Sequence, residues 1–342
     1  MFSIARSLAW FALLTATAAK LGASTVVGDN VVSESVSYDV HLSHGLHIPR
    51  VGLGTAGLPG KTVAVVREAL AAGVRLLDSA QAEEWYSEED VGKGIVEYCA
   101  ESEGNRNQLW DLVIITKIHP RSFREDLMRD MITRSRHLFY SGWYPTKESL
   151  DVVLLHSPYC WTGHCTKEEE AISWQEAWKS LEKFKERGKI RAIGVSNFDV
   201  NQLKELEGFS NTKIAIVQNW MDPLHQDVQV RKFCKDRGIV YMAYSSLGTQ
   251  WDGKFRGRNP VLENKTLRKI SIEHQTSVAS VVASWLLQEG VITIPRASSI
   301  EHIRENAFFG KRGDDGSFPV FLTYSNMQDI RRIDGSVGVP WE

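Results

Sequence analysis

Short apolar runs alternate along the chain with longer segments in which apolar residues recur every three or four positions. Eight runs have the length of buried strands: residues 51–53, 74–77, 112–115, 152–155, 190–195, 214–217, 239–243 and 291–294. Between them the apolar spacing is helical, as in Val63, Val66 and Leu70. Strands that alternate with amphipathic helices predict repeated βα units, and therefore a parallel sheet covered by helices.

Nearly every apolar run ends in a polar or reactive side chain. These residues are Asp78, Lys117, His156, Ser196, Asn197, Gln218, Tyr244, Ser245 and Arg296. In a closed barrel the carboxyl ends of all strands surround one mouth, whereas an open sheet concentrates its ligand groups behind one glycine-rich turn. Residues 52–57 contain only an incomplete version of that turn. The pattern therefore predicts an α/β fold of the (β/α)8 (TIM) barrel type.

The remaining chain is that of an ordinary globular protein. It has 342 residues, of which 43% are hydrophobic and 24% charged. Residues 35–42 and 46–49 alternate in polarity around His44 and Gly45, which predicts a β-hairpin before the barrel. Barrels of this length usually form one domain, so we expect residues 24–342 to be a single barrel domain. A formal net charge of -2 gives no electrostatic reason to expect nucleic-acid binding.

The first residues differ from the rest of the chain. Arg6 precedes an apolar stretch at 8–19, and small residues follow up to Ala23. A basic start, an apolar run of this length and an Ala-x-Ala-like site are typical of a secretory signal. We therefore expect residues 1–23 to be a signal peptide and the mature protein to have no membrane span. This places it in the secretory pathway or in an organelle reached through such a signal; the alternatives are a signal anchor or a terminal helix.

The four cysteines are too few for a disulfide-based scaffold. Cys160 and Cys165 are close enough in sequence to pair in an oxidising compartment. The alternative is two unpaired loop thiols. No second Cys/His pair stands at zinc-ligand spacing, so no metal site is expected. Asn264 begins a glycosylation sequon, which matters only if the chain enters the secretory pathway.

At the strand ends the sequence resembles the aldo-keto reductases, over about residues 44–337. Nine motifs occur in order: Ile48-Pro49-Arg50-Val51-Gly52-Leu53-Gly54-Thr55, Leu76-Leu77-Asp78-Ser79-Ala80, Ile115-Thr116-Lys117, Leu154-Leu155-His156-Ser157-Pro158, Gly194-Val195-Ser196-Asn197-Phe198, Val217-Gln218-Asn219, Ala243-Tyr244-Ser245-Ser246-Leu247-Gly248, Ile294-Pro295-Arg296 and Ile303-Arg304-Glu305-Asn306. The resemblance implies reduction of an aldehyde or ketone by a nicotinamide cofactor. It also implies that residues 322–337 form a helix covering the barrel.

Carbonyl reduction needs a hydride donor, a proton donor and a group that stabilises the developing oxyanion. The resemblance assigns Asp78 and Lys117 to a buried ion pair, and His156 to the hydrogen bond that orients the substrate oxygen. A tyrosine is the proton donor, and the lysine ammonium is expected to lower its pKa toward neutrality.

The position of that tyrosine is displaced in this sequence. In the family it follows the aspartate by five residues, where this chain has Glu83. Tyr86 lies eight residues after Asp78, and with Glu89 it keeps the family's Tyr-x-x-Glu spacing. Counting back from the following helix without gaps selects Trp85 instead, which has no acidic proton. Chemistry therefore favours Tyr86; a third alternative is that the donor is lost.

The resemblance also implies a dinucleotide site. Ser196, Asn197 and Gln218 match contacts to the nicotinamide carboxamide, Tyr244 matches the ring that stacks on the nicotinamide, and Ser245 and Leu247 match pyrophosphate contacts. Residues 248–260 match a loop that folds over the dinucleotide, although their glycines equally suit a passive loop.

The adenosine end is less typical of the family. The matching residues are Arg296, Ser298, Ser299, His302, Glu305 and Asn306. Arg296 can pair with a 2′-phosphate, but Ala297 and His302 stand where the family often has a serine and an arginine. NADP(H) is therefore the expected cofactor, with NAD(H) or dual use as the alternative.

The substrate is expected to be a small or medium carbonyl compound. Ala56 and Ser157 replace large aromatic residues that often line the family's pocket, so the mouth is wide unless Trp161, Trp220 or Trp251 refills it. The alternative functions are a nicotinamide-sensing regulatory or interaction protein of the same fold, and a structural barrel without cofactor.

Overall fold

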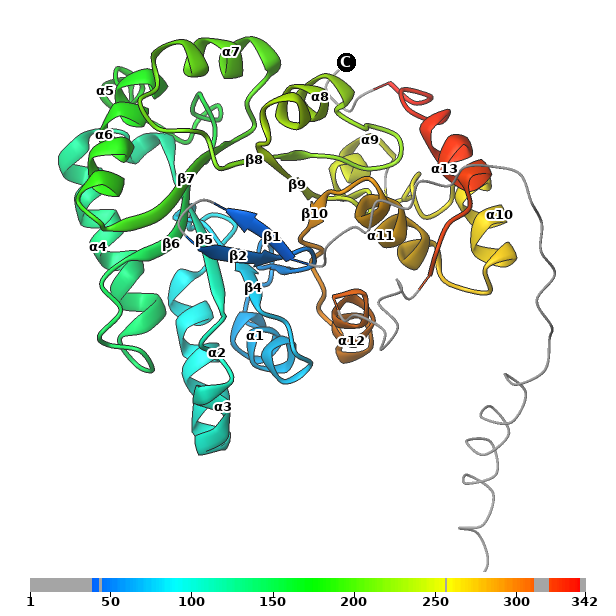
Figure 1. Cartoon of the computed structure of the whole chain (residues 1–342), viewed down its shortest axis with the longest axis horizontal. Coiled ribbons are helices and arrows are strands. Elements are labelled where there is room, and N and C mark those ends of the chain that lie inside the picture. The colour runs from blue at the N-terminus through cyan, green and yellow to red at the C-terminus, as the bar shows by residue number, and fades with distance from the viewer. Residues whose placement is uncertain (1–38, 43–44, 256, 311–319, 339–342) are drawn as a thin grey trace, which may run out of the picture. The chain divides into compact units, whose positions relative to one another are not determined.

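The computed structural model describes residues 39–42, 45–255, 257–310 and 320–338 (Figure 1). The fold below is that of the unit Val36–Glu342. The expected signal peptide, residues 1–23, lies outside the described residues, as do residues 35–38 of the expected hairpin.

Eight parallel strands form one continuous sheet in chain order. They are β3 (Leu53–Gly54), β4 (Leu76–Asp78), β5 (Val113–Ile118), β6 (Leu150–Leu155), β7 (Ile190–Ser196), β8 (Ile216–Trp220), β9 (Val240–Tyr244) and β10 (Ile292–Thr293). The first and last strands meet, because Val51 and Thr293 form a parallel bridge and the Gly52 amide donates to the Thr293 carbonyl at 2.9 Å. The sheet therefore closes, and all eight predicted strands are confirmed.

The strands bury both of their faces. In β6, Val152 and Leu154 belong to a core cluster inside the barrel, whereas Val153 and Leu155 belong to the larger cluster between the sheet and the helices. Successive side chains of a strand point to opposite faces, so a strand buried on both sides needs an unbroken apolar run. This explains why the strands appear in the sequence as continuous apolar segments.

A hairpin covers the amino-terminal end of the barrel. It consists of β1 (Asp39–Leu42) and β2 (Leu46–Pro49), which pair antiparallel as predicted. Leu46 and Ile48 are buried in the same cluster as the inward side chains of the barrel strands. Figure 1 shows this hairpin over the centre of the ring. The interior is therefore closed at this end, and the opposite end holds the polar strand termini.

Helices surround the sheet (Figure 1). They are α1 (Thr62–Ala71), α2 (Glu88–Glu101), α3 (Glu103–Asn107), α4 (Glu125–Tyr140), α5 (Lys167–Glu170), α6 (Trp174–Glu186), α7 (Val200–Phe209), α8 (Val228–Arg237), α9 (Asp252–Phe255), α10 (Lys265–Glu273), α11 (Val278–Gln288), α12 (Ile300–Phe309) and α13 (Tyr324–Arg331), with the short 3-10 turns η1 (Pro120–Ser122) and η2 (Thr249–Trp251). The terminal helix α13 packs beside α10, and the Ile330 carbonyl accepts a hydrogen bond from Gln226. In the described part of the chain no helix has the length and apolar character needed to cross a membrane.

Candidate active site

A buried ion pair lies at the carboxyl ends of two adjacent strands. Asp78 is the last residue of β4, and Lys117 comes from β5; their exposed fractions are 2% and 1%. The Lys117 ammonium donates to Asp78 Oδ2 at 2.6 Å and to the Ser79 carbonyl at 2.9 Å. Burial lowers the pKa of Lys117, while the Asp78 carboxylate raises it. Because each charge needs the other in this environment, the two side chains have a fixed geometry.

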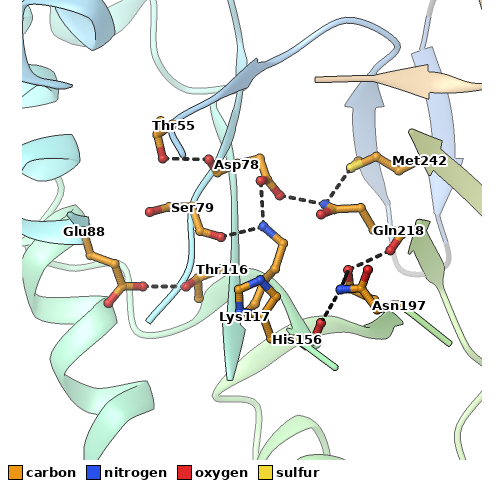
Figure 2. A network of polar contacts seen from close by, with 11 residues as sticks. Thr55, Asp78, Ser79, Glu88, Thr116, Lys117, His156, Asn197, Gln218 and Met242 are labelled. Atoms are coloured by element: carbon orange, nitrogen blue, oxygen red, sulfur yellow. Dashed lines mark hydrogen bonds and ion pairs between the residues drawn. The ribbon is translucent and has the colours of Figure 1, made fainter. Parts of the chain in front are cut away.

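Asp78 is also bound from the opposite side of the barrel (Figure 2). The Gln218 side-chain amide, on β8, donates to Asp78 Oδ1 at 2.7 Å. Both carboxylate oxygens of Asp78 therefore have a partner. The sequence places Gln218 with the cofactor residues and gives no indication of this contact, which joins the expected nicotinamide site to the ion pair.

His156 follows β6 and lies beside Lys117 (Figure 2). Its backbone carbonyl accepts a hydrogen bond from Asn197 Nδ2 at 2.8 Å. Burial holds the pKa of His156 well below its usual value, and the charge of Lys117 lowers that pKa further. The imidazole is therefore neutral at physiological pH, and a neutral ring donates a hydrogen bond to an oxygen through its single N–H.

The ring of Tyr86 lies beside Lys117 and His156. The Lys117 ammonium lies 5.0 Å from the centre of the Tyr86 ring, and the rings of Tyr86 and His156 are 5.9 Å apart. The neighbouring Trp85 is 39% exposed and packs against Trp161 at 5.2 Å. Glu83, at the family's usual tyrosine position, is exposed and pairs with Arg134. The loop thus brings Tyr86, and neither of the other two side chains, to Lys117 and His156.

The expected lowering of the Tyr86 pKa is wrong for this structure. Burial raises the pKa of Tyr86 well above its ordinary value, and the Asp78 carboxylate raises it further. The physical reason is that burial penalises the charged phenolate and that the nearby carboxylate repels it. Tyr86 is therefore a protonated phenol at neutral pH, the form that a proton donor needs.

The acidic residues that follow Tyr86 differ in their surroundings. Glu89 is exposed and pairs with Lys93 at 2.7 Å on the outer face of α2. The buried glutamate is Glu88, whose carboxylate accepts hydrogen bonds from Thr116 and Ser135. Thr116 directly precedes Lys117, so Glu88 anchors the start of α2 to β5. Sequence reasoning missed Glu88 because three acidic residues begin this helix and only one is buried.

Residues expected to contact the nicotinamide lie at the ends of β7, β8 and β9. Ser196 is buried and donates to the Gln218 carbonyl at 2.7 Å. The Tyr244 hydroxyl donates to Asn197 Oδ1 at 2.5 Å. Asn197 and Tyr244 also line a cavity of about 600 Å³ together with Trp220. None of the four catalytic candidates is among the described residues that line this cavity. The flat ring of Tyr244 beside the Asn197 amide, and not the cavity, is therefore what suits a nicotinamide.

The loop after β9 begins with Ser245, which has a positive φ of 54° and accepts a hydrogen bond from Gln250 at 3.3 Å. The Leu247 carbonyl accepts a hydrogen bond from Asn259 Nδ2 at 2.7 Å. Trp251 is fully buried and anchors the segment that contains η2 and α9. The two ends of the expected dinucleotide loop are therefore joined to each other through Asn259.

The residues expected at the adenosine end lie after β10 and in α12. Arg296 Nη1 donates to the Gly57 carbonyl at 3.1 Å, and within the described part of the chain it forms no ion pair with a carboxylate. Ser298 precedes Ser299, which caps α12 by accepting from the His302 amide, while Asn306 lies further along that helix. The Glu305 carboxylate instead accepts from Ser277 and Ser280 at the start of α11. Arg296 stands shortly before the N-terminus of α12 and has no carboxylate partner among the described residues. Both features favour binding of a phosphate group.

Of the three tryptophans expected to refill the mouth, one packs against the catalytic candidates. The ring of Trp161 lies 4.9 Å from that of His156. Trp220 and Trp251 both donate their indole N–H to the buried Asp222, at 2.9 and 2.8 Å. His119, which the sequence did not single out, lies 5.3 Å from the Trp161 ring. His119 stands two residues after Lys117, directly after β5, and this position at a strand end could have identified it from the sequence as a residue of the mouth.

The comparisons with known proteins agree with this geometry. The model of the Aldo/keto reductase family matches residues 50–312. Aldose reductase B of Dictyostelium discoideum is 32% identical over 284 residues, covering 78% of this chain and 84% of that protein. The 9,11-endoperoxide prostaglandin H2 reductase of Trypanosoma cruzi is 34% identical over 271 residues, with the same two coverages of 78% and 84%. The crystal structure of a Bombyx mori aldo-keto reductase in complex with NADP has a TM-score of 0.71 and 25% identity, covering 87% of this chain and 93% of that one.

The family match spans most of the barrel, from the segment that closes it to the end of α12. The relatives are reductases, and the ion pair, neutral histidine and protonated tyrosine suit the reduction of a carbonyl group. The chain therefore belongs to the aldo/keto reductase family and is an NAD(P)H-dependent reductase of aldehydes or ketones.

Proposed function

We propose that this protein reduces a small or medium carbonyl compound with NADPH, and that Tyr86 is the proton donor. The observation that carries the proposal is the position of Tyr86, with its ring 5.0 Å from the Lys117 ammonium and 5.9 Å from the His156 ring. A phenol, a neutral imidazole and an ammonium around one point are the groups that stabilise a developing alkoxide.

The cofactor supplies a hydride when it is bound. The Tyr86 hydroxyl donates its proton to the carbonyl oxygen as negative charge develops there. The neutral His156 ring donates a hydrogen bond to the same oxygen and orients the carbonyl group. Asp78 holds Lys117 beside the phenol, and the ammonium stabilises the phenolate that remains after proton transfer.

The dinucleotide is proposed to lie along the ends of β7 to β10. Asn197, Gln218 and Ser196 are available for the carboxamide, and Tyr244 for stacking on the nicotinamide ring. Ser245 and Leu247 are available for the pyrophosphate. The contacts to the adenosine and its 2′-phosphate are assigned to Arg296, Ser298, Ser299, His302, Glu305 and Asn306. Glu305 can reach the adenosine only if its carboxylate releases the hydrogen bonds from Ser277 and Ser280.

NADPH oxidation by the purified protein tests this function against a panel of aldehydes, quinones and ketoesters. Relatives include proteins named for aldose and glyoxal reduction, so sugars and dicarbonyls belong in the panel. Aldehyde-dependent oxidation with formation of the alcohol supports the reductase. Cofactor binding without turnover on any carbonyl favours the alternative, a nicotinamide-binding regulatory protein.

For the cofactor we expect NADPH to bind more tightly than NADH, and Arg296→Ala to reduce that difference. The variant removes one charge-assisted hydrogen bond to the 2′-phosphate, which is worth about 1.5–3 kcal/mol. Dissociation constants for both cofactors in both proteins measure the effect. Equal constants in the unmodified protein remove the proposed role of Arg296.

We also propose that the protein enters the secretory pathway or an organelle through its N-terminal segment. The mature chain is then expected to begin between about Ala19 and Ser24, after an Ala-x-Ala-like site. N-terminal sequencing of protein from its native host decides this. An intact Met1 on a cytosolic protein contradicts the signal and removes any glycan at Asn264.

A further inference from the structure

The orientation of the His156 ring is set by packing. Its Nδ1 atom is buried and has no hydrogen-bond partner in the described part of the structure. A functional histidine is usually oriented by a hydrogen bond at its second ring nitrogen. Here the imidazole instead makes edge-to-face contacts with two aromatic rings, Tyr86 at 5.9 Å and 70° and Trp161 at 4.9 Å and 76°. Trp161 therefore limits the rotation of His156.

Trp161 belongs to a loop that has no regular secondary structure of its own. No residue between β6, which ends at Leu155, and α5, which begins at Lys167, is in a helix or strand. A disulfide between Cys160 and Cys165 closes this loop around Trp161. The backbone adds one hydrogen bond, from the His164 amide to the Trp161 carbonyl at 3.0 Å. The disulfide is thus the covalent restraint next to the indole.

The same loop contacts the loop that carries Tyr86. The rings of Trp85 and Trp161 are 5.2 Å apart, and those of Trp85 and His164 are also 5.2 Å apart. His164 Nδ1 lies 3.5 Å from the Glu84 carboxylate, which also pairs with Arg121. The disulfide loop and the tyrosine loop therefore support each other on either side of His156.

We propose that Trp161 is a positioning residue for His156, and that the Cys160–Cys165 disulfide makes carbonyl turnover sensitive to thiol reductants. This rests on the proposed role of His156 in reduction. Cys160 and Cys165 are half-buried residues, so a small dithiol is the reductant of choice. Its thiolate attacks one sulfur and the S–S bond breaks. The second thiol then closes the reductant into a cyclic disulfide, and two electrons and two protons end on Cys160 and Cys165.

The loop closed by the disulfide is short, with a sequence separation of 5. A short loop loses little chain entropy on cross-linking, so the bond restrains this loop much more than the whole fold. The free cysteines Cys99 and Cys234 are buried. Because the cross-linked loop is short, breaking the disulfide is expected to free Trp161 without unfolding the barrel. His156 then loses one of its two packing surfaces.

A metal ion is the competing explanation for any effect of reduction. One ring nitrogen of His119 and both sulfur atoms lie within 4.8 Å of one another. However, His119 Nδ1 already accepts hydrogen bonds from the Arg121 amide at 3.1 Å and from its Nε at 3.0 Å. Arg121 Nη2, also a donor, lies 3.3 Å from His119 Nε2, so the guanidinium faces both ring nitrogens and a metal ion would have to displace it. The experiment accordingly includes a chelator.

The test compares oxidised and dithiothreitol-reduced full-length protein, both with EDTA, in steady-state aldehyde reduction by NADPH. Reduction is expected to lower kcat by about 10-fold to 10²-fold, because misplacing a catalytic group by about 1 Å has effects of this size. The dissociation constant for NADPH stays unchanged. The double variant Cys160→Ser/Cys165→Ser should match the reduced protein and not respond to dithiothreitol, whereas the matched control Cys234→Ser should respond like the unmodified chain.

Substitutions of Trp161 separate positioning from general stability. Trp161→Ala should lower kcat as reduction does, and Trp161→Phe should restore most of it because an aromatic ring again faces His156. Trp110→Ala is the matched control, since that tryptophan is 84% exposed. Normal turnover that responds neither to dithiothreitol nor to Trp161→Ala overturns this inference alone. A loss that requires added zinc and is reversed by EDTA assigns the effect to a metal and also overturns it. No turnover in the oxidised protein contradicts the proposed function itself.

Discussion

Replacing Tyr86 with phenylalanine is expected to lower kcat/KM for aldehyde reduction by about 10²-fold or more. The substitution keeps the ring that packs 5.9 Å from His156 and removes only the hydroxyl. Because His156 and Lys117 remain in place, the decrease in kcat/KM measures the contribution of proton donation by Tyr86. The dissociation constant for NADPH, measured by quenching of protein fluorescence, should change little.

The matched control is Trp85→Phe, at the position that an ungapped reading of the loop selects. Trp85 is 39% exposed and packs on Trp161 and His164, so this variant should keep most of the activity. The opposite result, with Tyr86→Phe fully active and Trp85→Phe inactive, shows that the loop adopts another register.

Replacing Lys117 with methionine is expected to reduce turnover by a similar factor. Without the ammonium, the Tyr86 phenolate forms next to an unbalanced Asp78 carboxylate, so the pKa of Tyr86, already raised by burial, rises further. Alcohol oxidation needs the phenolate as base. Its activity increases as pH rises toward that pKa, and the variant should therefore require a higher pH. Rates of reduction and oxidation across pH measure both effects.

Lys117→Met also leaves Asp78 buried without its cation, which costs about 3–5 kcal/mol of folding stability. The double variant Asp78→Asn/Lys117→Met removes both charges and keeps the amide close to Gln218. It should regain most of the lost thermal stability and remain inactive. Recovery of turnover in the double variant would show that Lys117 has only a structural role.

The sequence was sufficient to predict the barrel. Each strand is buried on both faces, as Val152 to Leu155 show, so the apolar runs are unbroken and easily recognised. Their polar ends identify the mouth because a closed barrel brings all of them together. Asp78 and Lys117 are therefore placed at the mouth by position alone. Their pairing is what the family resemblance implied, and their contact at 2.6 Å confirms it.

The details of the site depend on interactions that no local pattern contains. The contact between Gln218 and Asp78 joins residues 140 positions apart. Glu88 and Glu89 are chemically identical in sequence, and only packing against Thr116 and Ser135 selects Glu88 for burial. Burial and the Asp78 carboxylate both raise the pKa of Tyr86, and neither is visible in the local sequence around it.

Carbonyl reduction by this protein is tested most directly by transfer of deuterium from the cofactor to the substrate. Purified protein is mixed with NADPH deuterated at both C4 positions and with an aldehyde, and the alcohol is analysed by mass spectrometry. We expect one deuterium on the carbinol carbon of each alcohol molecule, and about 10²-fold less alcohol per unit time with Tyr86→Phe. Bound cofactor that stays reduced, with no alcohol formed from any carbonyl of the panel, would contradict this expectation.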